Sequence, residues 1–224
     1  MSRHYDQFCP VARVLDVVGE RWTLLIVREL LLGPRRFTDL AAGLPGIGTS
    51  VLTTRLKQLE HDGLVRKQTL PAPAASVVYE LTPSSLGLTA ILGAMANWGM
   101  SLLGRPGPDD RVQARWLVLC LAVTASDAHS VPDAAYELHV DDEIFHIRAQ
   151  DGQLAPSQGP AHSPAATIAM STDVLVAIAN GELDIPSPRA TRLITIDGAT
   201  PGAEQLLRAL AAAPAPRNSR SAPA

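Results

Sequence analysis

The stretch 35–82 decides the fold of the first half of the chain: RRFTDLAAGLPGIGTSVLTTRLKQLEHDGLVRKQTLPAPAASVVYELT. Phe37–Gly43 has the spacing of a short helix, and the Gly/Pro-rich segment 44–48 has the length of a turn between two crossed helices. A second helix is predicted over 50–62 and ends at Gly63. Two strand-like runs, 64–69 and 77–81, follow. The stretch therefore predicts a helix-turn-helix with a β-hairpin wing.

The helix 50–62 has two contrasting faces. Leu52, Leu56 and Leu59 recur at i, i+4 and i+7 and form one apolar stripe. The opposite side carries Ser50, Thr54, Lys57 and His61, flanked by Thr53 and Gln58. Small hydroxyls at the start of such a helix can reach base edges or phosphates in a DNA major groove. A solvated polar face is the alternative interpretation.

The residues expected at DNA fall into two groups. Base discrimination is assigned to Ser50, Thr53, Thr54 and Gln58, and phosphate contact to Arg35, Arg36, Arg55, Lys57 and Lys67, with Thr49 at the start of the helix. Arg35 and Arg36 precede the first helix, where cations meet a DNA backbone, although they could equally be solvated charges. The tip of the wing is proline and alanine, so the wing is expected to read sequence weakly.

Several motifs occur in order along this half and carry a resemblance to a known family. They are CPVA at 9–12, DVVGERWT at 16–23, LGPRRF at 32–37, LKQLEHDGLV at 56–65 and YELT at 79–82. Over about 9–100 the chain resembles the HxlR-type winged-helix regulators of bacteria. The resemblance implies a homodimeric transcription factor on double-stranded DNA, dimerised through its N-terminal helix and the helix after the wing.

Composition and charge suit two soluble domains with different partners. Residues 1–105 carry 11 Lys/Arg against 8 Asp/Glu, whereas 106–224 carry 8 against 14. A basic half and an acidic half are typical of a protein in which one domain binds a polyanion and the other does not. We expect no export signal, no membrane-spanning run and no disulfide framework, and hence a cytoplasmic protein.

Helical spacing predicts further elements around this stretch. A first helix starts at Cys9-Pro10 and ends at Gly19; a second, 21–32, is almost entirely apolar, and a third is predicted over 84–103. The predicted domains are 1–104, a linker at 105–111, a second domain at 112–212 and a disordered tail at 213–224. The apolar run 115–124 could be helix or strand; we favour a buried helix.

The clearest β signal lies in the second half. Tyr136, Leu138 and Val140 alternate with polar residues before a turn at Asp141-Asp142, which pairs Leu138 with Phe145 and Tyr136 with Ile147. A second turn follows at 151–152. Beyond it we predict a strand at Ala166–Met170, a helix 172–180 capped by Ser171, a strand 192–197 and a helix 201–212.

This order of elements resembles the sterol-carrier-protein-like fold over about 112–210. The fold class expected is therefore α+β: a winged helix-turn-helix domain followed by an α/β sterol-carrier-protein-like domain. The resemblance implies an apolar cavity that takes a small hydrophobic ligand, for which Tyr136, Leu138, Phe145 and Ile147 are the candidate residues. The segment 185–188 departs from the family pattern and leaves the shape of any pocket open.

Enzyme chemistry finds little support in the sequence. His139 and His146 lie on facing strands near Glu137, but no Cys or His pair has zinc-site spacing, and no phosphate loop or nucleophile elbow occurs. We expect no catalytic residues, no metal and no cofactor. Cys9 is the one candidate for redox chemistry, because a thiol at a helix start can react as thiolate and some members of the family sense oxidants near this position. The alternative interpretation is a small buried hydrophobe.

The function expected is a homodimeric transcription regulator, with repression or activation left open. Its second domain either binds a small apolar effector or only extends the dimer. A thiol-based redox regulator acting through Cys9 and a carrier of hydrophobic ligands are the alternatives.

Overall fold

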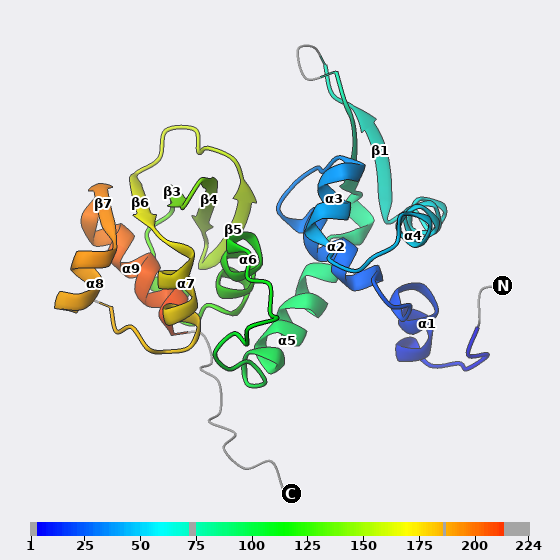
Figure 1. The fold of residues 1–224 in the computed structure, drawn as a ribbon, viewed down its shortest axis with the longest axis horizontal. Helices are drawn as coiled ribbons and strands as arrows, with labels where there is room; N and C mark the ends of the chain where they lie inside the picture. Colours follow the sequence, from blue (N-terminus) through cyan, green and yellow to red (C-terminus); the bar gives the residue numbers. More distant parts are fainter. Residues whose placement is uncertain (1–3, 72–74, 186, 213–224) are drawn as a thin grey trace, which may run out of the picture. The chain divides into compact units, whose positions relative to one another are not determined.

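The computed structural model describes residues 4–71, 75–185 and 187–212, which form two compact units divided between Leu92 and Gly93. The first unit contains α1 (Pro10–Val18), α2 (Thr23–Leu31), α3 (Phe37–Gly43), α4 (Thr49–His61), β1 (Val65–Thr69), β2 (Val77–Leu81) and the 3₁₀ turn η1 (Pro83–Ser85). Helix α5 (Leu88–Met100) spans the division between the units (Figure 1). The domain limits expected from composition, with a linker at 105–111, stay a prediction.

The core of the first unit gathers the apolar sides of α2, α3 and α4 under the wing. Its buried members are Ile26, Leu30, Leu40, Leu44, Leu52, Leu56, Leu59, Val65 and Tyr79. The leucine stripe of α4 lies entirely within this core, at 0–1% exposure. The predicted apolar face is thus confirmed, and because these leucines fix the rotation of α4, they also fix which of its residues face solvent.

The helices and strands of the predicted stretch occur close to their expected limits. Helix α3 and strand β2 have the predicted bounds, and α4 begins one residue earlier than predicted. Gly63 ends α4 with φ +70°, a left-handed conformation that glycine adopts without a steric penalty. β1 and β2 pair antiparallel, with Arg66 opposite Glu80 and Lys67 opposite Tyr79. The N-terminal half is therefore a winged helix-turn-helix.

The helix predicted over 84–103 is shorter in the structure. Residues Pro83–Ser85 form η1 instead, in which the Ser85 hydroxyl donates to the Thr82 carbonyl at 2.7 Å. Gly87, a poor helix former, separates this turn from α5. The local hydrogen bond and the glycine together delay the start of the helix to Leu88.

The second unit is a five-stranded sheet with helices packed on it. Its elements are α6 (Ala114–Thr124), the 3₁₀ turn η2 (Ala128–Ser130), β3 (Ala134–Val140), β4 (Glu143–Gln150), β5 (Gln153–Gln158), β6 (Ala166–Met170), α7 (Thr172–Ala179), α8 (Pro188–Leu193), β7 (Thr195–Gly198) and α9 (Thr200–Ala211). The strand order is β5-β4-β3-β6-β7, and only β3 and β6 are parallel neighbours. Helix α6 packs against β4 and β5, and α9 against β6 and β7 (Figure 1).

The hairpin β3–β4 has the predicted register. Leu138 pairs with Phe145 and Tyr136 with Ile147, around a turn whose Asp141 has φ +50°. All four paired side chains are buried at 0–1% exposure. The run 115–124 is helical, which confirms the buried-helix interpretation. Ser171 caps α7 as predicted, its hydroxyl accepting from the Val174 amide.

The strand predicted over 192–197 is wrong in its first half. Arg192 and Leu193 belong to α8, and the strand runs only from Thr195 to Gly198. The cause is a local helix start: the Ser187 hydroxyl accepts from the Ala190 amide at 3.1 Å, and a proline follows at the first helical position. The predicted disordered tail lies outside the described residues.

A close approach of α9 to the sheet leads to a first prediction. A Cβ on Gly202 would lie 2.6 Å from the Tyr136 hydroxyl, which is buried and donates to the Pro132 carbonyl. We expect Gly202→Ala to lower the free energy of unfolding by about 1–3 kcal/mol, the usual cost of overpacking. In a Tyr136→Phe background the same substitution should cost less, because the crowded oxygen is gone. Urea unfolding of the four proteins measures both values; equal costs in the two backgrounds would contradict the proposed clash.

Candidate nucleic-acid interface

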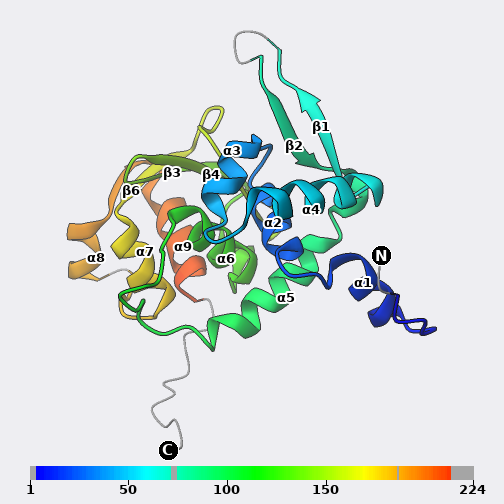
Figure 2. The same cartoon turned by 45° about the vertical axis from the view of Figure 1, so that its right-hand side comes forward.

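The exposed face of α4 carries most of the residues predicted at DNA. Thr49, Ser50, Thr54, Lys57 and Gln58 are exposed, while Thr53 and Arg55 are half-buried. Figure 2 shows α4 along its length, with the hairpin β1–β2 rising from the region of its C-terminal end. The helix thus presents a polar surface on the side opposite its leucine core.

The two threonine hydroxyls on this face already use their single hydrogen. Thr53 Oγ1 donates to the Thr49 carbonyl at 2.8 Å, and Thr54 Oγ1 donates to the Ser50 carbonyl at 2.9 Å. Each side chain therefore has only acceptor lone pairs and a methyl group left for a partner. Gln58 donates through Nε2 to the Asp62 carboxylate at 3.0 Å.

Two of the predicted phosphate-binding cations are paired with acids. Arg55 Nη2 lies 3.1 Å from Glu20 Oε2, and Lys67 Nζ lies 3.6 Å from Glu60 Oε2. Lys67 also lies 5.4 Å from the centre of the Tyr79 ring. The pKa of Lys67 is raised above its usual value, mainly by its electrostatic interaction with Tyr79 and next by that with Glu60. These two cations hold intramolecular partners that DNA would have to replace.

The other cations differ in accessibility. Arg35 is half-buried and its backbone bridges to Tyr79, with N–H to O distances of 2.9 and 2.7 Å. Arg36 and Lys57 are exposed, and neither forms an ion pair within the part of the chain that the structure describes. The backbone amide of Arg36 donates a hydrogen bond to the Asp39 carboxylate at the start of α3. Lys57 is thus the exposed, unpaired cation on α4.

On the wing, the remaining cation of β1 is also neutralised. Arg66 Nε lies 2.6 Å from Glu80 Oε1 across the β1–β2 pair. Sequence reasoning missed this pairing, although the hairpin register could have shown it, because Arg66 and Glu80 are cross-strand neighbours. The partner of Arg55, by contrast, is 35 residues away and left no local signal.

The remaining candidate residues belong to neither α4 nor the wing. Cys9 is half-buried at the N-cap position of α1, where its side chain makes no capping hydrogen bond. The four residues proposed for an apolar ligand, Tyr136, Leu138, Phe145 and Ile147, are core residues of the second unit. Both roles stay predictions.

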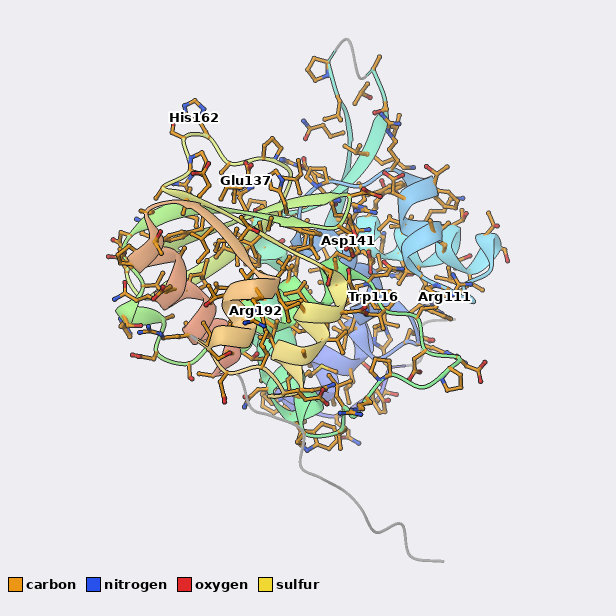
Figure 3. All side chains as sticks on the ribbon, turned by 60° about the vertical axis from the view of Figure 1, so that its left-hand side comes forward. Arg111, Trp116, Glu137, Asp141, His162 and Arg192 are labelled. Carbon is orange, nitrogen blue, oxygen red and sulfur yellow. The ribbon has the colours of Figure 1, made fainter. Side chains whose placement is uncertain are left out.

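Glu137, on strand β3 of the second unit, joins a loop to the sheet. Glu137 Oε1 lies 2.7 Å from His139 Nε2, and its Oε2 accepts from the Ala161 amide at 2.8 Å; the hydrogen bond with His139 is the main cause of the lowered pKa of Glu137. Figure 3 shows Glu137 beside the loop that carries His162. Among the described residues, no three His, Cys, Asp or Glu side chains group as a metal site, and no helix is long and apolar enough to cross a membrane.

Comparison with known proteins gives matches to this half of the chain. The family model described as HxlR-like helix-turn-helix matches residues 17–106. The HTH-type transcriptional regulator YvaP of Bacillus subtilis is 37% identical over 94 residues, which are 42% of this chain and 87% of YvaP. The HTH-type transcriptional regulator YodB of the same organism is 35% identical over 94 residues, 42% of this chain and 84% of YodB.

A solved structure of the reduced form of YodB from B. subtilis matches with 33% identity and a TM-score of 0.38, covering 45% of this chain and 99% of that one. The two B. subtilis sequences each align over most of their own length, and the matched region contains the leucine stripe and the polar face of α4. Through residues 17–106, the chain belongs to the HxlR-like helix-turn-helix family of transcriptional regulators.

Proposed function

We propose that the protein is a homodimeric regulator that binds an inverted-repeat site in double-stranded DNA, with one half-site for each α4. The observation that carries the proposal is the two-sided character of α4. Its leucines are fixed in the core, whereas its opposite face presents hydroxyls, an amide and the unpaired Lys57 to solvent. Such a helix can enter a major groove without disturbing the fold.

The roles of the individual residues follow from their surroundings. Ser50, Thr53, Thr54 and Gln58 are proposed to contact base edges, with Thr49 at the start of the helix. Lys57 and Arg36 are proposed as the main phosphate contacts, because each is exposed and unpaired within the described residues. Arg35, Arg55 and Lys67 are proposed as weaker contacts, the last two because they must first leave Glu20 and Glu60.

The homodimer is supported by exposed apolar side chains outside the DNA-binding face. On α1, Val11 is 67% exposed and Leu15 42%, at the i,i+4 spacing of one helix side, and nearby Phe8 is fully exposed. On α5, Met95 and Trp98 are exposed as well. Apolar side chains gathered on single helices are typical of surfaces that a partner covers. A second copy of this chain is the partner proposed.

The dimer and its site lead to a second prediction. If two α4 helices enter successive major grooves of one face, half-site centres should lie about 34–36 Å apart. Footprinting on the upstream region of the protein's own gene should show two protected half-sites, and sedimentation at micromolar concentration should show a dimer. A monomer, or a footprint on one half-site, would contradict the proposal.

A third prediction concerns how Thr54 reads a base. Its hydroxyl hydrogen is bound to the Ser50 carbonyl, so the side chain can accept a hydrogen bond or place its methyl against a thymine methyl. Thr54→Val keeps the methyl and Thr54→Ser keeps the hydroxyl. We expect one of the two to lose about 1–3 kcal/mol of discrimination at a single base pair while the other retains it. Binding to a library of half-sites measures this; a uniform loss on all sequences would remove Thr54 from base reading.

The second unit is proposed as a sterol-carrier-protein-like domain that adjusts DNA binding in response to a small effector. The element order and the strand order β5-β4-β3-β6-β7 support the proposal. An effector can shift DNA binding only if it binds one state of the dimer better than the other, typically by about 1–3 kcal/mol. No catalytic role is proposed for either unit, and the expected location is the cytoplasm. A carrier of hydrophobic ligands is the alternative, distinguished by ligand binding without an effect on operator affinity.

A redox function for Cys9 is the second candidate, favoured by its place at the N-cap of α1. Reactive thiols in other proteins occur at helix starts, which is the place that Cys9 occupies. Alkylation of the native protein, with a Cys9→Ser variant as control, tests it: loss of operator binding in the native protein alone supports thiol sensing, and unchanged binding removes it.

A further inference from the structure

A half-open cavity of about 350 Å³ lies on the second unit, beside the edge strand β7, where α8, β7 and α9 meet. Ile194, Ile196 and Leu207 give it apolar walls, and Thr191, Thr195 and Glu204 give it polar groups. The volume falls within the range of small-molecule sites, which are mostly apolar with a few oriented polar groups. None of the four buried residues of the β3–β4 hairpin lines it, so a ligand here would leave that core in place.

The polar side of the cavity has a definite charge. Glu204 is its one acidic lining residue among those that the structure describes, and its side chain is 37% exposed. Oε2 of Glu204 lies 3.2 Å from Nη2 of Arg208, one turn further along α9. Neither Arg208 nor Arg192, an exposed residue of α8, is among the residues that line the cavity. Glu204 therefore gives the cavity an acidic lining residue, and Arg208, the cation paired with it, is not among the lining residues.

We propose that this cavity binds a small amphipathic amine. The alkyl part would pack against Ile194, Ile196 and Leu207, and the ammonium group would bind the Glu204 carboxylate and the threonine hydroxyls beside it. At about 30 Å³ for each water of liquid volume, the cavity has room for roughly a dozen non-hydrogen atoms. This inference deepens the effector part of the proposed function, and only its consequence for DNA binding rests on that function.

Three probes with alkyl chains of equal length are n-octylamine, n-octanol and n-octanoate. Comparing them distinguishes recognition of the ammonium charge from packing of the alkyl chain. Isothermal titration calorimetry on the full-length protein should show saturable binding in the order amine, alcohol, carboxylate. Glu204→Gln should weaken the amine about twofold to fivefold, the range typical of partly exposed charge pairs, and leave the alcohol unchanged. Arg208→Gln should strengthen the amine by a similar factor, because it removes the competing cation.

Two further variants fix the location. Glu182→Gln makes the same charge change at a residue that does not line the cavity, so amine affinity should be unaffected. Thr195→Trp fills the cavity from an exposed position on β7 and should abolish binding of amine and alcohol alike. Thermal unfolding checks that each variant folds; Glu204 and Arg208 are partly exposed, so both glutamine variants should fold.

The outcomes are decisive. Absence of saturable amine binding, an unchanged amine affinity in Glu204→Gln, or full binding in a folded Thr195→Trp would each overturn the inference. DNA affinity measured on the same preparations separates the two proposals. Amine binding without any change in DNA affinity removes the effector role and leaves the site, whereas DNA binding without amine binding removes the site and leaves the regulator.

Discussion

Lys57→Glu is expected to lower DNA affinity about a hundredfold at roughly 0.1 M salt. A cation that neutralises one phosphate contributes about 0.9 to the slope of log affinity against log salt, which is close to tenfold at that concentration. Placing an acid at the same position loses this contribution and adds a repulsion of similar size. Lys57 is exposed and unpaired within the described residues, so none of the effect is offset by an intramolecular partner.

The controls separate local contact from net charge. Lys57→Gln should give only the tenfold loss and lower the salt slope by about one unit. Arg148→Glu makes the same charge change on β4 in the second unit, at another exposed side chain, and should leave DNA affinity within about twofold of the native protein. Titrations at several salt concentrations measure all three. Equal losses for Lys57→Glu and Arg148→Glu would show a general charge effect and remove Lys57 from the interface.

The paired cations should behave differently from Lys57. Arg55 and Lys67 already have favourable interactions with Glu20 and Glu60 in the free protein. Moving either cation to a phosphate exchanges one ion pair for another, so its net contribution to binding is smaller. Because acidic residues pair with some of the cations near α4, fewer Lys and Arg side chains should contribute to DNA affinity than their number in the sequence indicates.

Local patterns made the first unit predictable. The leucine spacing of α4, the Gly/Pro turn before it and Gly63 after it are each encoded within a few residues, and the structure has these elements within about one residue of the predicted limits. The hairpin β3–β4 was predictable for the same reason, since a two-residue turn fixes the register of both strands.

What the sequence did not reveal depends on distant or competing contacts. The strand predicted at 192–197 failed because the cap at Ser187 favours a helix that continues through Leu193. The ion pair of Arg55 with Glu20 joins residues 35 positions apart, and the cavity beside Glu204 is formed by α8, β7 and α9 together. Neither leaves a periodic signal in any one segment.

Glu29 is another residue whose burial the sequence pattern did not predict. It lies on α2, a helix expected to be apolar on nearly all sides, and is 2% exposed. Its Oε1 accepts from Arg28 Nη2 at 2.7 Å, and Arg28 is itself largely buried, with a side-chain exposure of 19%. A Cβ on Gly43 would lie 2.7 Å from Glu29 Oε2, so α3 approaches the carboxylate closely at a position where only glycine avoids contact.

Glu29→Ala is therefore expected to lower the free energy of unfolding by about 3–5 kcal/mol, because it leaves the buried Arg28 charge without this partner. Against a typical total of about 5–15 kcal/mol, such a loss would weaken DNA binding through unfolding alone. Glu20→Ala, which removes an exposed acid, should cost at most about 1 kcal/mol. Gly43→Ala gives a second test, since it should destabilise the native protein but cost much less in the Glu29→Ala background, where the crowded carboxylate is absent. Urea unfolding of these variants measures each value; a Glu29→Ala protein as stable as Glu20→Ala would show that the buried pair of Arg28 and Glu29 contributes little to stability.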